Sequence, residues 1–239
     1  YELKGAGMDI QPKFLSQVFV ANPLGGIKLP VKSNNTLERV PNKDCISFSG
    51  AVNKSGEDKV KELLDNTAFE FKKANGDVFK GTIKEYFEDS IISHNPTSNL
   101  SLVHCTNSKE VANSIIENGL DWQKTGRMKC GPGTYFARSS FGGSEQGAGS
   151  VPIEGTYIGN KDEYPVFSKN FYEAVTYNQD LQNAVAEIVP DDTNKAVNKY
   201  CHDLLQDDMG IDLLYASSGY GTGAYAVINN DCMRLSPLY

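Results

Sequence analysis

The stretch that decides the fold of this chain begins Leu100-Ser-Leu-Val-His104-Cys-Thr106 and ends Cys130-Gly-Pro-Gly-Thr-Tyr135-Phe-Ala. Its first part is a short apolar run that is typical of a β-strand, with His104 near the carboxyl end. Its last part breaks the chain at Gly131-Pro132-Gly133 and then predicts a second strand, which carries Tyr135. The two strands together present a histidine and a tyrosine, which is the outline of a ligand site.

The segment between these strands has the pattern of a helix. Asn107 is placed to cap its N-terminus, with Glu110 three residues later to complete a capping box. Gly119 stands where a helix commonly ends in a left-handed residue. Apolar residues recur between them at helical spacing, at Val111, Ala112, Ile115 and Ile116. We therefore expect the order strand, helix, turn and strand.

These motifs resemble those of ADP-ribosyltransferases of the diphtheria-toxin and poly(ADP-ribose)-polymerase type. That family carries His-Gly-Ser or His-Gly-Thr on one strand and Gly-x-Tyr-Phe-Ala on the next. Here the matching residues are His104-Cys-Thr106 and Gly133-Thr-Tyr135-Phe-Ala. Near the end of the chain, Gly210-Ile-Asp-Leu-Leu-Tyr and Ala224-Tyr-Ala-Val-Ile are similar to the family's last pair of strands. The resemblance covers residues 99–235.

The resemblance implies NAD as co-substrate and assigns roles to individual residues. His104 would hydrogen-bond the adenosine ribose, Tyr135 would stack on the nicotinamide ring, and the backbone of Cys105 would hold the nicotinamide amide. The full set of residues expected to bind NAD is His104, Cys105, Thr106, Tyr135, Ser139 and Ser140.

The resemblance also implies an α+β fold, with split antiparallel β-sheets and flanking helices over residues 98–239. Residues 1–97 lie outside the resemblance, and we expect them to form a small α+β region. That region either recognises a partner or serves the structure alone.

Two positions depart from the family pattern. Cys105 replaces a glycine, which a backbone contact at negative φ tolerates. Ala224 stands where the family's catalytic glutamate opens the last strand. Departure of nicotinamide leaves positive charge on the ribose, which a nearby carboxylate stabilises. Either the carboxylate comes from elsewhere, or the enzyme is slow, or the chain is not an enzyme.

Glu187 is the preferred source of that carboxylate. It lies in the apolar run Asn183-Ala-Val-Ala-Glu187-Ile-Val-Pro, which we read as a strand. An acid in such a run either faces solvent or serves a function, and both interpretations stay open. Weaker candidates are Glu145, Glu154 and Asp231. The sequence contains no Glu-x-Glu pair, which disfavours the arginine-directed toxin branch of the superfamily.

Composition narrows the function classes further. The 239 residues carry a net charge of −7, which argues against a nucleic-acid surface and against RNA 2′-phosphate transfer on the same fold. No apolar run approaches the roughly 20 residues that span a bilayer. The five cysteines lack zinc-site spacing, so no metal is expected. A His104–Cys105 thiol dyad is disfavoured because adjacent strand residues point to opposite faces.

Several further elements are expected along the chain. A helix follows the cap Ser55-Gly-Glu-Asp58, and a hairpin turns at Asn75-Gly76. Residues 93–98 are read as a connector, and 142–150 as a loop beside the site. We also expect a secondary-structure element at 14–20 and a helix over 193–205. Ile83, Tyr86 and Phe87 recur at helical spacing, and two strands are expected within 211–235.

The function implied by the resemblance is NAD-dependent mono-ADP-ribosylation of a protein side chain. The chain would be a bacterial toxin or effector, secreted and delivered to the host cytoplasm, where the compartment is reducing. Its acceptor would be a host protein, with ubiquitin as the candidate. Two alternatives stay open: a catalytically inactive module that binds NAD, ADP-ribose or a protein, and an NAD glycohydrolase.

Overall fold

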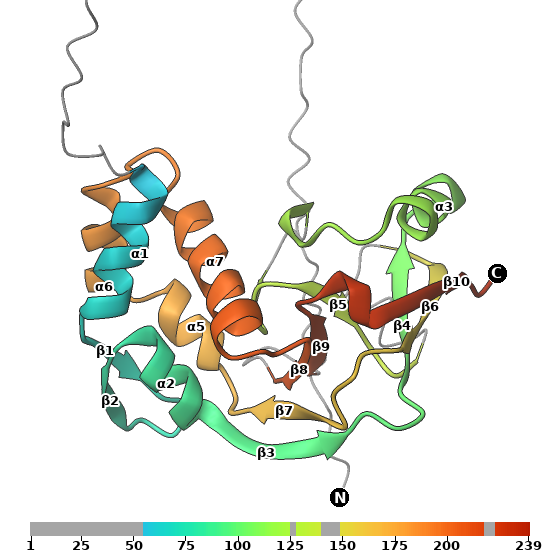
Figure 1. Cartoon of the computed structure of the whole chain (residues 1–239), viewed down its shortest axis with the longest axis horizontal. Coiled ribbons are helices and arrows are strands. Elements are labelled where there is room, and N and C mark those ends of the chain that lie inside the picture. Colours follow the sequence, from blue (N-terminus) through green and yellow to red (C-terminus); the bar gives the residue numbers. More distant parts are fainter. Residues whose placement is uncertain (1–54, 125–127, 140–148, 218–222) are drawn as a thin grey trace, which may run out of the picture. The chain divides into compact units, whose positions relative to one another are not determined.

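A computed structural model of the chain describes residues 55–124, 128–139, 149–217 and 223–239. These residues belong to a compact unit that spans Ala51–Tyr239. Helices and several β-sheets make it an α+β fold, so the expected class is confirmed (Figure 1). The predicted boundary between residues 97 and 98 lies within this unit. The elements expected at 14–20 and most of 142–150 lie outside the described residues.

The first described elements are two helices that flank a hairpin. Ser55 and Asp58 form a capping box at the first helix, as the sequence predicts. The hairpin pairs Phe69–Lys72 with Val78–Gly81 in antiparallel register, and Gly76 adopts a φ of 94° in its turn. These elements are α1 (Gly56–Asn66), β1 (Phe69–Lys72), β2 (Val78–Gly81) and α2 (Ile83–Ser90).

A five-stranded sheet lies at the centre of the unit, in the order β3-β7-β8-β9-β5. All neighbours are antiparallel except β7 and β8. Its strands are β3 (Ile91–Pro96), β7 (Glu163–Phe167), β8 (Leu213–Ala216), β9 (Ala224–Val227) and β5 (Thr134–Phe136). The strand predicted around Tyr135 is confirmed as β5, and the two strands predicted within 211–235 are confirmed as β8 and β9, with β10 beginning at the end of that range.

The expected connector at residues 93–98 is wrong, because most of it belongs to β3. This edge strand has no apolar alternation, and it is fixed by pairing with β7 along its length. Ile92 forms an irregularity in the register, and Pro96 ends the strand. Edge strands accept proline and bulges, which is why the local sequence resembles a loop.

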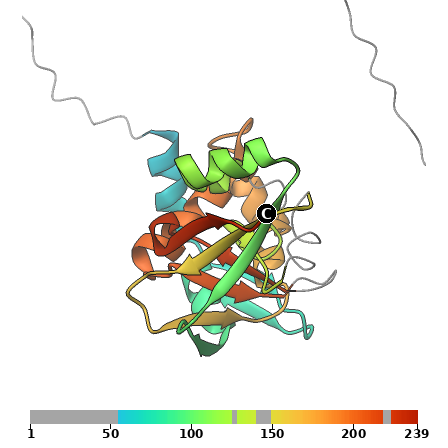
Figure 2. The ribbon, with the colours of Figure 1, turned by 90° about the vertical axis from the view of Figure 1, so that its right-hand side faces the viewer.

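The second sheet has three strands, in the order β10-β6-β4. Its members are β10 (Met233–Pro237), β6 (Val151–Tyr157) and β4 (Ser101–Thr106), and helix α3 (Lys109–Asn118) packs against all three (Figure 2).

The N-cap of α3 is Ser108, whose side chain accepts a hydrogen bond from the Val111 backbone N–H, so the prediction of Asn107 as cap is wrong by one residue. Gly119 ends the helix at a φ of 84°, as predicted.

Helices connect β7 to β8 on one side of the five-stranded sheet. They are α5 (Phe171–Thr176), α6 (Gln179–Ala186) and α7 (Thr193–Asp203), and a π-helical turn η2 (Leu204–Asp208) follows α7. Short 3-10 turns occur elsewhere, at η1 (Trp122–Lys124) and η3 (Asn230–Cys232). Among the described helices, none is long and apolar enough to cross a membrane.

The strand predicted over residues 183–190 is wrong, because its first half is the end of α6. Asn178 caps this helix by accepting a hydrogen bond from the Leu181 backbone N–H. Leu181 and Val185, four residues apart, are fully buried on one face of the helix. Glu187 follows in the turn after α6 and is exposed.

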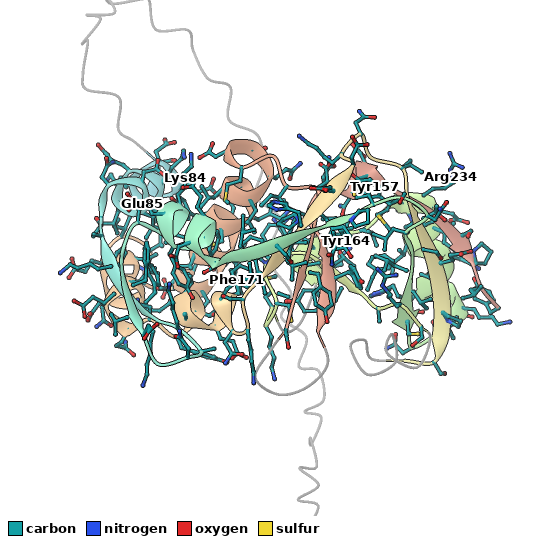
Figure 3. The ribbon with its side chains drawn as sticks, turned by 90° about the horizontal axis from the view of Figure 1, so that it is seen from below. Lys84, Glu85, Tyr157, Tyr164, Phe171 and Arg234 are labelled. Atoms are coloured by element: carbon teal, nitrogen blue, oxygen red, sulfur yellow. The ribbon has the colours of Figure 1, made fainter. Side chains whose placement is uncertain are left out.

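The five-stranded sheet separates two hydrophobic cores. Tyr135, Ala224 and Ala226 face the helices, in a core that we call the helical core. Alternate residues of the same strands, such as Phe136 and Tyr225, face the three-stranded sheet, in what we call the sheet core. In Figure 3, Phe171 lies toward the helices and Tyr164 toward the three-stranded sheet, in agreement with their cores.

We expect Phe87→Ala to lower the free energy of unfolding by about 3–5 kcal/mol, the cost of emptying a buried aromatic site. The Phe87 ring is fully buried, and its centroid lies 5.4 Å from that of Phe171 and 6.3 Å from that of Phe167. Urea denaturation measures the change. Val78→Ala, at a side chain that is 62% exposed, is the control and should change the value by less than about 0.5 kcal/mol. Equal effects would contradict the packing of α2 on α5.

Candidate functional site

The two large sheets meet at one β-bridge, between Val103 of β4 and Ala137 just after β5. The Val103 backbone N–H donates to the Ala137 carbonyl at 2.7 Å, and the Ala137 N–H donates back to the Val103 carbonyl at 2.9 Å. Beyond this pair the described residues of β4 and β5 form no further ladder with each other. The sheets therefore split next to His104 and Tyr135, which the sequence predicts to form the site.

His104 spans this split. Its ring nitrogen Nδ1 lies 2.7 Å from the Tyr135 backbone carbonyl, and its ring centroid lies 5.4 Å from that of Phe136. A carbonyl oxygen only accepts, so we place the imidazole proton on Nδ1. Burial lowers the pKa of His104, more than the bond to Tyr135 raises it. A neutral imidazole results, whose Nε2 lone pair can accept a hydrogen bond from a ligand hydroxyl.

Tyr135 holds the glycine-rich turn in place. Its hydroxyl donates to the Gly131 carbonyl at 2.7 Å and accepts from the Cys130 backbone N–H at 2.8 Å. The side chain is only 7% exposed, and burial, followed by nearby Cys130, raises its pKa well above the usual value. Little of the ring is therefore open to a ligand in this structure, and its stacking on nicotinamide stays a prediction.

The turn itself requires its two glycines. Gly131 adopts a φ of 117°, in the region that favours glycine. A Cβ at Gly133 would lie 2.6 Å from the Val227 carbonyl oxygen on β9. The turn thus runs against β9 at backbone distance, and this close approach fixes where β5 begins.

The other residues expected to bind NAD are in three different situations. Cys105 is buried on β4, and burial raises the pKa of its thiol, which favours the neutral form. The Thr106 hydroxyl lies 2.9 Å from the Ser108 carbonyl, so it contributes to the end of β4. Ser139 is exposed just after the bridge, and Ser140 lies outside the described residues.

Arg138 adds a fixed cation beside the bridge. Its Nε donates to the Tyr225 hydroxyl at 2.6 Å, and one terminal nitrogen lies 3.5 Å from the Tyr164 hydroxyl. Both bonds, that to Tyr225 first, raise the pKa of Arg138. The residue is exposed, so its remaining donors can meet an anion such as a diphosphate. No sequence motif pointed to it.

The structure places Ala224 at the first residue of β9, fully buried and facing the helical core. The start of the strand thus offers no carboxylate. Glu187 is exposed after α6, a helix that packs chiefly against α7, and it does not lie on a strand as expected. Its assignment as the catalytic carboxylate stays a prediction without a supporting contact.

Glu173 of α5 is a carboxylate that sequence reasoning missed. It is half-buried, and its Oε1 is fully buried without a hydrogen-bond partner among the described residues. Its charge is one of the influences that raise the pKa of Tyr135, after burial and Cys130. In the sequence, Phe171-Tyr-Glu173-Ala-Val-Thr reads as an ordinary amphipathic helix with an acid in its first turn, and no local signal distinguishes this glutamate.

A pocket of about 410 Å³ lies elsewhere, between α1 and α7. Charged residues line much of it, among them Lys61, Lys199, Asp203 and Asp207. Lys61 is paired with Asp65 at 3.1 Å, and Lys199 with Asp203 at 2.6 Å. None of the residues predicted for the site lines this pocket. Within the described ranges, no group of His, Cys, Asp and Glu could hold a metal ion.

Comparison with known proteins finds no matching family model, no matching curated protein and no matching solved structure. The assignment of a function therefore depends on the residues and contacts of this chain.

We expect the stability of the protein to fall as the pH drops below about 6.5, and His104→Asn to reduce that fall. The pKa of His104 is lower in the folded protein than its ordinary value of 6.5, so below that value the unfolded state binds more protons. His202, whose pKa burial also lowers, contributes in the same direction in both proteins. Urea denaturation at pH 7.5 and pH 5 measures the difference. An unchanged pH dependence in His104→Asn would contradict the neutral, half-buried imidazole.

We expect Tyr135→Phe to lower the free energy of unfolding by about 1–3 kcal/mol, because the buried Cys130 N–H and Gly131 carbonyl lose their hydrogen bonds to the Tyr135 hydroxyl. Thermal or urea unfolding measures the loss. Tyr177→Phe is the matched control, since Tyr177 is 74% exposed. If both variants are as stable as the wild type, the Tyr135 hydroxyl does not hold the turn.

Proposed function

We propose that this chain is an NAD-dependent mono-ADP-ribosyltransferase, with its NAD site at the split between β4 and β5. The observation that carries the proposal is the contact of His104 with the Tyr135 carbonyl at 2.7 Å, next to the bridge where the sheets part. The two motifs of the resemblance are far apart in the sequence and yet come together there. A histidine that only filled space in a core would have no reason to lie where the hydrogen bonds between two strands stop.

The site offers groups that suit separate parts of NAD. The His104 Nε2 would accept a hydrogen bond from a hydroxyl of the adenosine ribose. The backbone of Cys105 at the split would hold the nicotinamide amide. The Arg138 guanidinium, oriented by Tyr225, would bind the diphosphate through charge-assisted hydrogen bonds.

In the reaction, the bond between ribose C1′ and the nicotinamide nitrogen breaks, and its electron pair leaves with nicotinamide. A nucleophilic oxygen of the acceptor side chain then forms a bond to C1′ and releases its proton. The acceptor would be a host protein, with ubiquitin as a candidate, met after delivery by a bacterium. If water is the acceptor, the same step is NAD hydrolysis.

A second function is favoured by the buried Ala224 at the start of β9. Without a carboxylate at that place, a module that binds NAD or ADP-ribose without turnover keeps every other contact of the site. Nicotinamide release separates the two functions, because only the enzyme produces it.

We expect the wild type to release nicotinamide from NAD, and His104→Ala to release it at least about tenfold more slowly, as the loss of one hydrogen bond to a bound ribose predicts. His94→Ala, on the exposed edge strand β3, is the control. Chromatographic detection of nicotinamide gives the rates, and isothermal calorimetry gives the affinity for NAD.

Stimulation of release by host lysate, with labelled ADP-ribose on a protein, would support transfer, and release without any labelled protein would indicate a glycohydrolase. Binding of NAD without release would support the inactive module. A wild type that neither binds nor cleaves NAD would contradict both functions.

A further inference from the structure

We propose that the pocket between α1 and α7 is a docking site for a basic segment of a partner protein. The segment would carry lysine or arginine residues beside at least one apolar side chain. The residues that line the pocket belong to α1, α7, η2 and the turn before α7, so they are separate from the split between β4 and β5. This inference therefore does not depend on the proposed function.

The pocket has an apolar floor. Helices α1 and α7 pack against each other (Figure 1), and a Cβ at Gly56, where α1 begins, would lie 3.1 Å from the Val189 side chain. Val60, Tyr200 and Leu204 are buried and line the pocket from the two helices and η2. Its volume of about 410 Å³ is within the range of ligand pockets. Such a floor suits an apolar side chain or the methylene groups of a lysine or arginine.

Acidic side chains outnumber basic ones around this floor. Six acidic and three basic residues line the pocket. Among the acidic ones, Glu57, Asp192 and Asp207 are exposed and take part in none of the ion pairs between described residues. The rim therefore keeps negative charge that the lysines of the pocket do not neutralise.

The pocket already holds a cation against an aromatic ring. The Lys61 Nζ lies 5.8 Å from the centroid of the Tyr200 ring, and the Tyr200 hydroxyl donates to Asp65 Oδ1 at 2.8 Å. The hydrogen bond to Asp65 is the main cause that raises the pKa of Lys61. The pKa of Lys199 is also raised, first by its hydrogen bond to Asp203 and then by other acids of the pocket. Surroundings that favour these ammonium groups favour the basic side chains of a partner as well.

The end of α7 contributes to the acidic rim through the π-helical turn η2. Turns of this kind are rare and occur frequently at functional sites. Asp207 and Asp208 both belong to η2 and line the pocket together with Asp203, the last residue of α7. The wide turn thus places three carboxylates along one end of the pocket.

Charge complementarity distinguishes among the possible occupants. The whole chain has a net charge of −7, so a second copy would be repelled, and a nucleic acid would be repelled more strongly. A small cation meets few of these carboxylates at once. A segment with several basic residues can meet carboxylates on both helices while an apolar side chain enters the floor, which gives charge and shape complementarity together.

The test measures binding of a labelled peptide that repeats Lys-Lys-Leu to the full chain by fluorescence anisotropy. Peptides that repeat Glu-Glu-Leu and Lys-Lys-Ser serve as comparisons. We expect the wild type to bind the Lys-Lys-Leu peptide most tightly, and to lose affinity when the salt concentration rises from about 50 mM to about 0.5 M. Hydrogen exchange with this peptide should show protection in α1 and α7.

The variant Glu57→Gln/Asp207→Asn removes two rim charges. We expect it to bind the Lys-Lys-Leu peptide about three- to thirtyfold more weakly, as the loss of two exposed ion pairs predicts. The matched control is Glu88→Gln/Glu117→Gln, at exposed positions on α2 and α3, which should bind like the wild type. Thermal unfolding verifies that both variants are folded.

Several results would overturn the proposal. These are a wild type that does not bind the Lys-Lys-Leu peptide, equal binding by the two double variants, equal binding of any two of the three peptides, and protection outside α1 and α7. A dimer in sedimentation that Glu57→Gln/Asp207→Asn dissociates would assign the pocket to a second copy and would also overturn it. NAD binding and nicotinamide release do not enter this test, so the proposed function and the docking site can each fail while the other stands.

Discussion

The pair of hydrogen bonds between Val103 and Ala137 is the constraint on which the rest of the structure depends. It joins the five-stranded sheet to the three-stranded sheet at one point, and the ladder stops beside it in the described residues. A longer ladder would close the space between β4 and β5. His104 and Tyr135 lie on separate sheets, and without the bridge their strands would have no backbone pairing to hold them side by side. The single bridge joins β4 and β5 at Val103 and Ala137. Beyond these two residues the described strands no longer pair with each other.

The groups around this junction are fixed by buried interactions. Tyr135 bonds to both ends of the Cys130–Gly131 peptide segment, and the turn approaches β9 at a distance that only glycine allows. The His104 imidazole is oriented by a carbonyl of the neighbouring strand. Such preorganisation commonly lowers the stability of the protein at functional sites. In return, the site does not have to rearrange when a ligand binds.

The local sequence predicted those elements in which the apolar pattern and the turn residues both indicate the same structure. The strands around Val103 and Tyr135 and the hairpin at Gly76 are of this kind, because glycine and alternating apolar residues leave few other conformations. Strand β3 was missed because its residues have no apolar alternation. It is a strand because it pairs with β7. The run before Glu187 was misread because a short apolar run suits a helix as well as a strand. Glu173 could not be found, since only the tertiary packing of α5 shows its unpaired oxygen.

The central claim is that NAD binds at the split between β4 and β5. Amide hydrogen exchange followed by mass spectrometry, with and without saturating NAD, tests it most directly. The account predicts slower exchange in peptides covering residues 101–106 and 130–137, and no change in α1 or in the neighbouring α7. Protection confined to α1 and α7, around the charged pocket, would contradict it, and so would the absence of any protection.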